Sequence, residues 1–372
     1  MTAMGIIFAN IYDSSLGELT NKRTMASLPF GGRYRQIDFA LSNLANAGIR
    51  RIGIISWHNY HSLMAHIGSG EEWDLELQEG GLEFLTPYAM GKVSSYRGKL
   101  DALNSFMFYL TRPGSEEYVV LSDSSVLYNI DINKVLESHI ASGKDITVLC
   151  KDGVANGEKQ LDLAMKTDEN GNISDLTVDY CAPEGYLASM GLFVISRELL
   201  VHHVREAVVR NRYRLERDFV LPQYSQGNLS VNVYCHDGVV LYNESTEEYY
   251  RSNMAVLDSK VRHDLFGGSH PIYTKVRDQV PSYYGYDCRV EDCVIADGCK
   301  LEGDVKNSVL FRHVKVGAGA EIEDCVIMND TAVGEDCHLK YVILDKDVVV
   351  KPGTELIGSR TNPLIIKRGE TV

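Results

Sequence analysis

The sequence has little positive charge for its length and lacks any long apolar run. It contains 37 Lys and Arg residues against 51 Asp and Glu residues, which gives a formal net charge of −14. This balance argues against general binding to nucleic acid or anionic lipid, although it leaves room for a local basic pocket. No apolar run reaches the roughly 18 residues that a membrane span needs. Residues 1–8 are too short and uncharged for a signal peptide, so we expect a cytoplasmic protein.

The eight cysteines also lack one informative spacing, because no two of them form Cys-x-x-Cys. That spacing is typical of zinc sites and of thioredoxin-type redox sites, so we expect neither. In a cytoplasmic protein, cysteines stay reduced and pack as small apolar side chains. We therefore expect no metal and no cofactor from the cysteines.

Apolar runs alternate with helix-like segments over residues 1–150. The expected strands lie at 5–8, 51–55, 118–121 and 146–149, and the expected helices at 39–47, 61–66, 100–110 and 132–141. Strands separated by helices predict βαβ units and a mostly parallel sheet. Ligands of such sheets usually bind beyond the carboxyl ends of the strands, here in the loops after residues 8, 55 and 121.

From about residue 285 the periodicity changes. Short aliphatic segments recur every 15–17 residues, and a second series interleaves at 316–322, 333–339 and 350–356. This is the hexapeptide signature of a parallel β-helix, in which one inward aliphatic side chain per short strand stacks along the prism. A β-sandwich with coincidental spacing is the alternative. We expect inward aliphatic side chains at positions 295, 310, 316, 322, 327, 333, 339 and 356.

Several long blocks, in order along the chain, closely resemble the ADP-glucose pyrophosphorylase (glucose-1-phosphate adenylyltransferase) family. They are 19–23, 29–43, 45–53, 96–98 with Asp101 and Ala102, and 187–191. The resemblance covers nearly the whole chain. It implies an α/β fold: a Rossmann-like (GT-A-like) nucleotidyltransferase domain with a mostly parallel or mixed sheet over 1–254, a connector over 255–284, and a left-handed β-helix over 285–372.

The catalytic positions that the resemblance assigns are altered in this chain. The family's Gly-rich loop, A-G-G-x-G-T-R-L, falls on residues 9–16. There Ile11 replaces a glycine, Asp13 adds negative charge where phosphate should lie, and Ser15 replaces the arginine. A β-branched residue adopts positive φ only at a cost. The family's signature lysine falls on Met25, so a charge-assisted contact of about 1.5–3 kcal/mol is missing.

The metal and sugar-phosphate positions differ as well. The two metal-binding aspartates of the family fall on Ser125 and Arg214, and the glucose-phosphate lysine falls on Asp179. Each tenfold in rate corresponds to about 1.4 kcal/mol, so several such losses leave little catalysis. Asp123 lies two residues before Ser125 on the same strand face, and it is the alternative metal ligand if the chain is active. Only that alternative would require Mg²⁺.

The nucleotide-side motif Y-x-G-T-A-D-A is partly kept. Its remnant consists of Tyr96, Arg97, Gly98 and Asp101. The threonine and alanine of the motif have become Lys99 and Leu100. We expect these bulkier side chains to fill part of the base pocket.

The resemblance also implies an effector site. In active relatives, basic residues bind a phosphorylated effector between the domains, and the matching positions here are Lys22, Arg23 and Arg35. A basic cluster in an acidic protein favours anion binding. The alternative is that Arg23 and Arg35 pair with carboxylates such as Asp38.

The degenerate positions resemble the non-catalytic, GlgD-type regulatory subunits of this family. That resemblance implies association with a catalytic subunit in glycogen biosynthesis, as a homodimer or mixed tetramer, with a phosphorylated metabolite as effector. The acidic charge balance predicts no nucleic acid or membrane partner. Two alternatives stay open. One is an active nucleotidyltransferase rebuilt around Asp123, and the other is a hexapeptide acyltransferase that would use His313 or His338.

Overall fold

The structure, a computed structural model, describes residues 2–10, 13–77, 80–87, 96–169 and 171–372. The chain forms two compact units. Unit 1 comprises residues 1–11, 40–58 and 68–240, and unit 2 comprises residues 12–39, 59–67 and 241–372. The second unit therefore joins two N-terminal segments to the C-terminal part of the chain. The division at residues 254 and 284 that we predict from the sequence stays a prediction.

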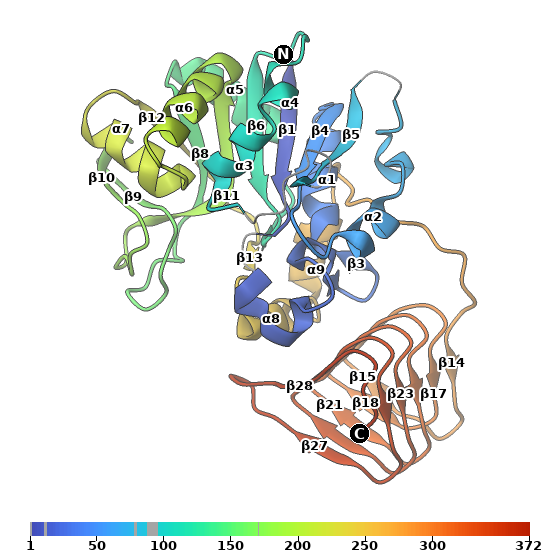
Figure 1. Cartoon of the computed structure of the whole chain (residues 1–372). Coiled ribbons are helices and arrows are strands. Elements are labelled where there is room, and N and C mark those ends of the chain that lie inside the picture. The colour runs from blue at the N-terminus through green and yellow to red at the C-terminus, as the bar shows by residue number, and fades with distance from the viewer. Residues whose placement is uncertain (1, 11–12, 78–79, 88–95, 170) are drawn as a thin grey trace. The chain divides into compact units, whose positions relative to one another are not determined.

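Unit 1 is built on one mixed sheet, which has nine strands in the part of the chain that the structure describes (Figure 1). The strand order is β10-β9-β11-β6-β1-β4-β5, and β8 pairs with both β11 and β12. Parallel pairing of β1 with β4 and β6 matches the predicted βαβ units, whereas β11 is antiparallel to β6 and β8. The bounds are β1 (Ala3–Phe8), β4 (Arg51–Ile55), β5 (Gly81–Leu85), β6 (Tyr118–Asp123), β8 (Ile146–Lys151), β9 (Ala164–Thr167), β10 (Ile173–Thr177), β11 (Leu187–Ser196) and β12 (Val231–Cys235), with the short β7 (Val126–Leu127) beside them.

The predicted helix over 100–110 is two helices in the structure. They are α3 (Lys99–Ser105) and α4 (Met107–Thr111), and the break falls at Phe106, which has φ −112° and ψ 31° and buries its ring. The other helices are α1 (Gln36–Asn46), η3 (Glu71–Trp73), α5 (Ile132–Ser142), α6 (Arg197–Val209), η5 (Glu216–Val220) and α7 (Leu221–Ser225), with α1 beginning in unit 2. No described helix is both long and apolar enough to cross a bilayer.

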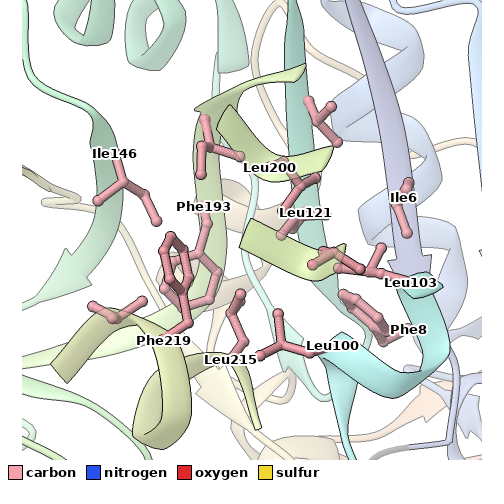
Figure 2. Packing of buried hydrophobic residues seen from close by; sticks show 14 of the residues in the cluster. Ile6, Phe8, Leu100, Leu103, Leu121, Ile146, Phe193, Leu200, Leu215 and Phe219 are labelled. Atoms are coloured by element: carbon pink, nitrogen blue, oxygen red, sulfur yellow. The ribbon is translucent and has the colours of Figure 1, made fainter. Parts of the chain in front are cut away.

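The core of unit 1 lies between the sheet and the helices α3, α4 and α6. Figure 2 shows Ile6 and Phe8 of β1, Leu121 of β6 and Phe193 of β11 in one buried cluster with Leu103 of α3. All five side chains are buried. Apolar residues at alternating strand positions share one face of the sheet, so packing a helix on that face removes them from water together. This packing fixes the first turn of α3 next to the carboxyl ends of β1 and β6.

Unit 2 begins with short elements and ends in the β-helix. Its irregular part contains η1 (Asp13–Thr20), η2 (Met25–Ser27), β2 (Pro29–Phe30), β3 (Tyr34–Arg35), α2 (His61–Ile67), β13 (Leu241–Tyr242), α8 (Thr246–Ala255) and α9 (Ser259–Phe266). Helices α8 and α9 each begin at a residue whose side chain accepts a hydrogen bond from a first-turn N–H, namely Ser245 and Asp258. Such caps stabilise a helix start by about 0.5–2 kcal/mol.

The β-helix consists of three parallel sheets, each with five strands among the described residues. The first sheet contains β14 (Tyr283–Tyr284), β17 (Lys300–Leu301), β20 (Lys315–Val316), β23 (Ala332–Val333) and β26 (Val349–Val350). The second contains β15 (Val290–Glu291), β18 (Asp304–Lys306), β21 (Glu321–Glu323), β24 (His338–Lys340) and β27 (Glu355–Ile357). The third contains β16 (Val294–Ile295), β19 (Val309–Leu310), β22 (Val326–Ile327), β25 (Val342–Leu344) and β28 (Leu364–Ile366). The predicted left-handed β-helix of hexapeptide repeats is thereby confirmed.

The aliphatic side chains predicted to point inward do so. Six of them are buried, at positions 310, 316, 322, 327, 333 and 339, while Ile295 and Leu356 in the outer coils are half-buried against the same core. At one corner of successive coils Asp292, Asn307, Asp324 and Tyr341 all have positive φ. Asn and Asp tolerate this left-handed conformation better than most residues, which explains their recurrence at a tight corner.

We predict that Val333→Asp strongly destabilises unit 2. Val333 is 3 % exposed and stacks between Val316 and Val350 in the first sheet. An unpaired carboxylate at this place would lower the free energy of unfolding by about 3 kcal/mol or more. Urea unfolding of both variants would measure the effect against Val349→Asp, since Val349 is 45 % exposed in the adjacent strand of the same sheet. Equal unfolding midpoints for the two variants would show that Val333 is not inward.

Candidate functional site

A buried lysine lies at the carboxyl edge of the unit 1 sheet. The Lys99 ammonium donates to Asp123 Oδ2 at 2.8 Å and to Glu216 Oε1 at 2.6 Å. Asp123 ends β6, Lys99 begins α3 and Glu216 begins η5, so three separate elements converge here. All three side chains are buried, and the ammonium also lies 5.7 Å from the Phe8 ring and 5.5 Å from the Phe193 ring. The site is therefore an enclosed cation between two carboxylates.

Burial and charge act in opposite directions on these groups. Burial alone would lower the pKa of Lys99, but Asp123 and Glu216 outweigh it and raise that pKa above its ordinary value. Burial raises the pKa of Asp123 to about 7, with repulsion from Glu216 adding to the effect and Lys99 opposing it. The lysine consequently stays protonated and supplies the positive charge of the cluster.

The backbone of β11 approaches Asp123 closely. Gly191 has φ +71°, and a Cβ atom there would lie 2.5 Å from Asp123 Oδ2. The pairing of β11 with β8 shifts register between Ser189 and Phe193, around this glycine. A glycine is thus required where the strand bends past the carboxylate. The other oxygen, Asp123 Oδ1, is buried and has no hydrogen-bond partner within the described ranges.

The metal ion that the resemblance implies does not fit these residues. The two expected ligand positions hold the Ser125 hydroxyl and the Arg214 guanidinium, and Ser125 is buried. The nearby carboxylates, Asp123 and Glu216, already hold the Lys99 ammonium. A divalent cation would have to share this enclosed space with a positive charge, so no catalytic step is derived through a metal here.

Asp179 and Arg214, two of the altered catalytic positions, contact each other. Arg214 Nη1 lies 3.3 Å from Asp179 Oδ2, and Arg217 Nη2 lies 2.8 Å from the same oxygen. The resemblance expects a lysine at 179 and an aspartate at 214, so both charges are reversed and the reversed pair is complementary. The sequence predicts both substitutions but not their contact.

The nucleotide-side remnant is a compact local cluster. The Arg97 guanidinium donates to Asp101 at 3.1 Å and lies 3.5 Å from the centroid of the Tyr213 ring. A Cβ atom on Gly98 would lie 2.3 Å from the Tyr213 carbonyl oxygen, which makes glycine necessary there. Leu100 is fully buried in the core rather than lining an open pocket. Arg97 and Asp101 thus contact each other, while Arg97 and Gly98 also lie against Tyr213.

In the Gly-rich loop region, Asp13 has a structural contact. Its Oδ1 accepts a hydrogen bond of 2.7 Å from the Met25 backbone N–H, and both residues are buried in unit 2. Ser15 is exposed on η1. Ile11 lies outside the described residues. The carboxylate at 13 therefore stabilises the chain turn that leads to η2.

Among the three basic residues predicted to bind an effector, Arg23 forms a buried ion pair. Its guanidinium donates to both carboxylate oxygens of Asp345, and both side chains are almost completely buried. Asp345 lies next to β25 in the β-helix, so the pair joins the N-terminal part of unit 2 to its C-terminal part. The predicted partner Asp38 contacts His66 at 2.6 Å and accepts a hydrogen bond of 2.8 Å from the Arg35 backbone N–H. Arg23 is thus a structural residue as well as part of a basic cluster.

Arg35 and Lys346 form the more available part of this cluster. Arg35 Nη1 donates to the Ser62 carbonyl oxygen at 2.7 Å, and burial lowers its pKa to about 10, with Arg23 and Arg368 adding. Burial, with Arg35 and Arg23 adding, lowers the pKa of Lys346 to about 7. Lys22 is exposed. Reasoning from the sequence missed Lys346 and Arg368, because they lie more than 300 positions away.

The two histidines of the acyltransferase alternative lie on the outside of the β-helix. His313 Nδ1 lies 3.0 Å from Asp330 and its Nε2 lies 2.5 Å from Gln279. His338 Nδ1 lies 3.3 Å from Glu321. Both histidines are held by polar neighbours at the surface, where a general base would need an enclosed substrate beside it.

One set of side chains within the described ranges has metal-ligand spacing. His202, His203 and Glu206 on α6 place one ligand atom each within 4.8 Å of the others. Glu206 also pairs with Arg210 at 2.5 Å. Because the charge of Glu206 is already paired with Arg210, we assign no metal to these three residues.

Comparisons with known proteins agree with the fold. Residues 5–238 match the nucleotidyl transferase family, and residues 280–362 match the GlmU-like, C-terminal hexapeptide family. The chain is 33 % identical over 367 residues to the glycogen biosynthesis protein GlgD of Bacillus subtilis, covering 98 % of this chain and 96 % of that protein. It is 35 % identical to the GlgD of Geobacillus stearothermophilus over 367 residues, with the same coverage of both chains.

A catalytic relative matches slightly less well. The glucose-1-phosphate adenylyltransferase of Acetivibrio thermocellus is 30 % identical over 353 residues, which cover 93 % of this chain and 82 % of that enzyme. The match to the GlgD proteins extends over nearly the full length of both chains. This chain therefore belongs to the nucleotidyl transferase family, among the GlgD glycogen biosynthesis proteins and their glucose-1-phosphate adenylyltransferase relatives.

Proposed function

We propose that this chain is a non-catalytic, regulatory subunit in glycogen biosynthesis. It associates with a catalytic glucose-1-phosphate adenylyltransferase and modulates the formation of ADP-glucose and pyrophosphate from ATP and glucose 1-phosphate. The kinship with GlgD proteins and with the adenylyltransferases supports this assignment. The partner's active-site loops would then be biased by docking, a coupling typically worth about 1–3 kcal/mol.

The observation that carries the proposal is the reversed ion pair between Asp179 and Arg214. A carboxylate at the sugar-phosphate position repels the phosphate of the substrate, and a guanidinium cannot coordinate a metal ion. Because the two reversed charges contact each other, the Asp179 carboxylate is paired without substrate. A chain with this arrangement keeps its scaffold and acts through its surfaces.

Exposed aromatic side chains mark the surfaces for docking. Tyr283, Tyr284 and Tyr286 are at least half exposed near the first β-helix strand, beside a cleft of about 530 Å³ whose acidic lining includes Glu302. Phe108 on α4 is 46 % exposed in unit 1. Aromatic residues are enriched at protein interfaces, and an acidic cleft favours a basic partner surface. We assign the symmetric dimer or mixed tetramer contacts to these two places.

We predict that adding this chain to its catalytic subunit changes that subunit's turnover rate, apparent substrate affinity or effector response. The measurement is a titration of the chain into the catalytic subunit with ADP-glucose formation as the readout. Tyr286→Ala should weaken the modulation by removing an interface anchor. Tyr180→Ala is the matched control, since Tyr180 is 51 % exposed in unit 1 and outside both proposed surfaces. Flat rates across the whole titration would sink the regulatory proposal.

We predict that the isolated chain does not bind ATP·Mg²⁺ with micromolar affinity. Met25 replaces the signature lysine, and the Lys99 ammonium fills the place of a cation between Asp123 and Glu216. Isothermal titration calorimetry is the direct test. Micromolar ATP affinity, or ADP-glucose formation by the chain alone, would instead favour an active enzyme rebuilt around Asp123.

The basic cluster of unit 2 is proposed as an anion site for a phosphorylated metabolite, with Lys22, Arg23 and Arg35 as the predicted residues and Lys346 added by the structure. The pKa of Lys346 is lowered to about 7, so this lysine is charged below that pH and neutral above it. Sulfate is the simplest probe, because its own charge stays constant over this range. An anion beside Lys346 favours the protonated form.

We therefore predict that sulfate affinity falls as the pH rises through about 7. The Lys22→Ala/Arg35→Ala double variant should lose about tenfold or more in affinity, and Lys346→Met should flatten the pH dependence. Lys340→Met is the matched control, because Lys340 pairs with Glu323 on the same β-helix. If the double variant binds sulfate and modulates the partner as the wild type does, the anion site is wrong while the interface proposal stands.

A further inference from the structure

A buried lysine between two carboxylates needs an explanation of its own. The exposed fractions of Lys99, Asp123 and Glu216 are 8 %, 4 % and 9 %. Moving such groups out of water costs several kcal/mol for each ion, and the cost is offset only when geometry and hydrogen bonding are good. Here the ammonium makes two short contacts, at 2.8 and 2.6 Å. The pocket is therefore organised around this one positive charge.

The two carboxylates converge on a single point. One comes from the carboxyl end of β6 and the other from the first turn of η5, and the same nitrogen contacts both. Without a cation between them, two like charges would face each other in a low-dielectric environment. Asp123 Oδ1, buried and without a hydrogen-bond partner in the described part of the chain, adds a further oxygen to this space. Converging carboxylate oxygens are the ligands that hard divalent cations prefer.

The position of the two acids in the sequence points the same way. Asp123 lies two residues before Ser125, and Glu216 lies two residues after Arg214. Ser125 and Arg214 are the positions where relatives would carry metal-binding aspartates. The chain has neither of the ligands that the resemblance implies, but two acids lie close by in sequence and contact a lysine.

We propose that Lys99 is a built-in counter-ion that takes the place of a divalent cation in this pocket, and that its removal converts Asp123 and Glu216 into a divalent-cation site. The rings of Phe8 and Phe193 close two sides of the ammonium, within 6 Å of it, and stabilise a positive charge through their faces. Because the ammonium is covalently attached to the chain, it stays beside Asp123 and Glu216 in the folded protein. The pocket of the natural chain is consequently closed to divalent cations.

The counter-ion role of Lys99 goes beyond the proposed regulatory function, and an experiment can contradict either one without the other. It concerns only the interior of unit 1, whereas the regulatory role concerns contacts with a partner. If the wild-type chain modulates its partner but binds Mn²⁺ at Asp123, the counter-ion role of Lys99 is wrong and the regulatory function stands. A chain that excludes Mn²⁺ and has no effect on any adenylyltransferase would do the reverse.

The experiment measures Mn²⁺ binding to the full-length chain by electron paramagnetic resonance of free Mn²⁺, at the same mildly alkaline pH for every variant. Lys99→Met should acquire one site with an affinity at least about tenfold above any binding by the wild type, because a positive charge in direct contact is gone. Adding Asp123→Asn to this variant should abolish the site. Lys99→Arg should behave as the wild type, since it keeps the charge.

The matched control is Lys151→Met. Lys151 is another partly buried lysine of unit 1, but its ammonium donates to the backbone carbonyls of residues 236, 237 and 238. Its removal should create no Mn²⁺ site. Thermal unfolding with and without Mn²⁺ gives a second readout, in which only Lys99→Met is stabilised by the metal.

Three results would overturn the proposal. The first is a wild-type chain that binds Mn²⁺ and loses it with Asp123→Asn. The second is a folded Lys99→Met chain that binds no Mn²⁺ or binds it equally after Asp123→Asn. The third is a Lys99→Met chain that stays unfolded with and without Mn²⁺, because freed carboxylates should recover the fold by taking up the metal.

Discussion

The contact of one ammonium with two carboxylates joins three elements of unit 1 at the carboxyl edge of its sheet. Lys99, Asp123 and Glu216 come from α3, β6 and η5, and their ion pairs join three elements that are far apart in sequence. Each buried charge would be costly alone, and removing one partner leaves the others uncompensated. The close approach of Gly191 to Asp123 and the packing of α3 on the core both accompany this arrangement. A charge carried on the chain itself thus holds together the carboxyl edge of the sheet.

Unit 2 also contains a buried ion pair, formed by one guanidinium and one carboxylate. Arg23 is buried against Asp345, so a residue near the N-terminus is tied to the β-helix more than 300 positions later. This pair brings Arg35 and Lys346 into one positively charged environment, which adds to the lowering of both pKa values by burial. A positive cluster that is only partly neutralised has excess charge for an anion. The structural role of Arg23 and the proposed anion site are therefore parts of one arrangement rather than alternatives.

The fold was largely predictable because its signals are local and repeated. The strands of the α/β unit and the inward residues of the β-helix follow from hydrophobic periodicity, which one sequence displays directly. The break at Phe106 was not predictable, because the apolar pattern continues across it. The site was predictable only as a set of substitutions. The sequence indicates only that Lys99 is bulkier than the residue that the family motif has there. That its ammonium contacts Asp123 of β6 and Glu216 of η5 becomes evident only in the structure.

The altered residues are coordinated rather than scattered. Asp179 and Arg214 reverse two expected charges and pair with each other, while Lys99 matches two acids with one cation. Without Lys99, the buried carboxylates of Asp123 and Glu216 would have no cation beside them, a cost of several kcal/mol in a protein whose whole stability is about 5–15 kcal/mol. The contacts of Lys99 with both acids avoid that cost. A buried ion cluster that is complete without substrate supports the surface around it. The proposed role, which depends on contacts with a partner, requires such a surface.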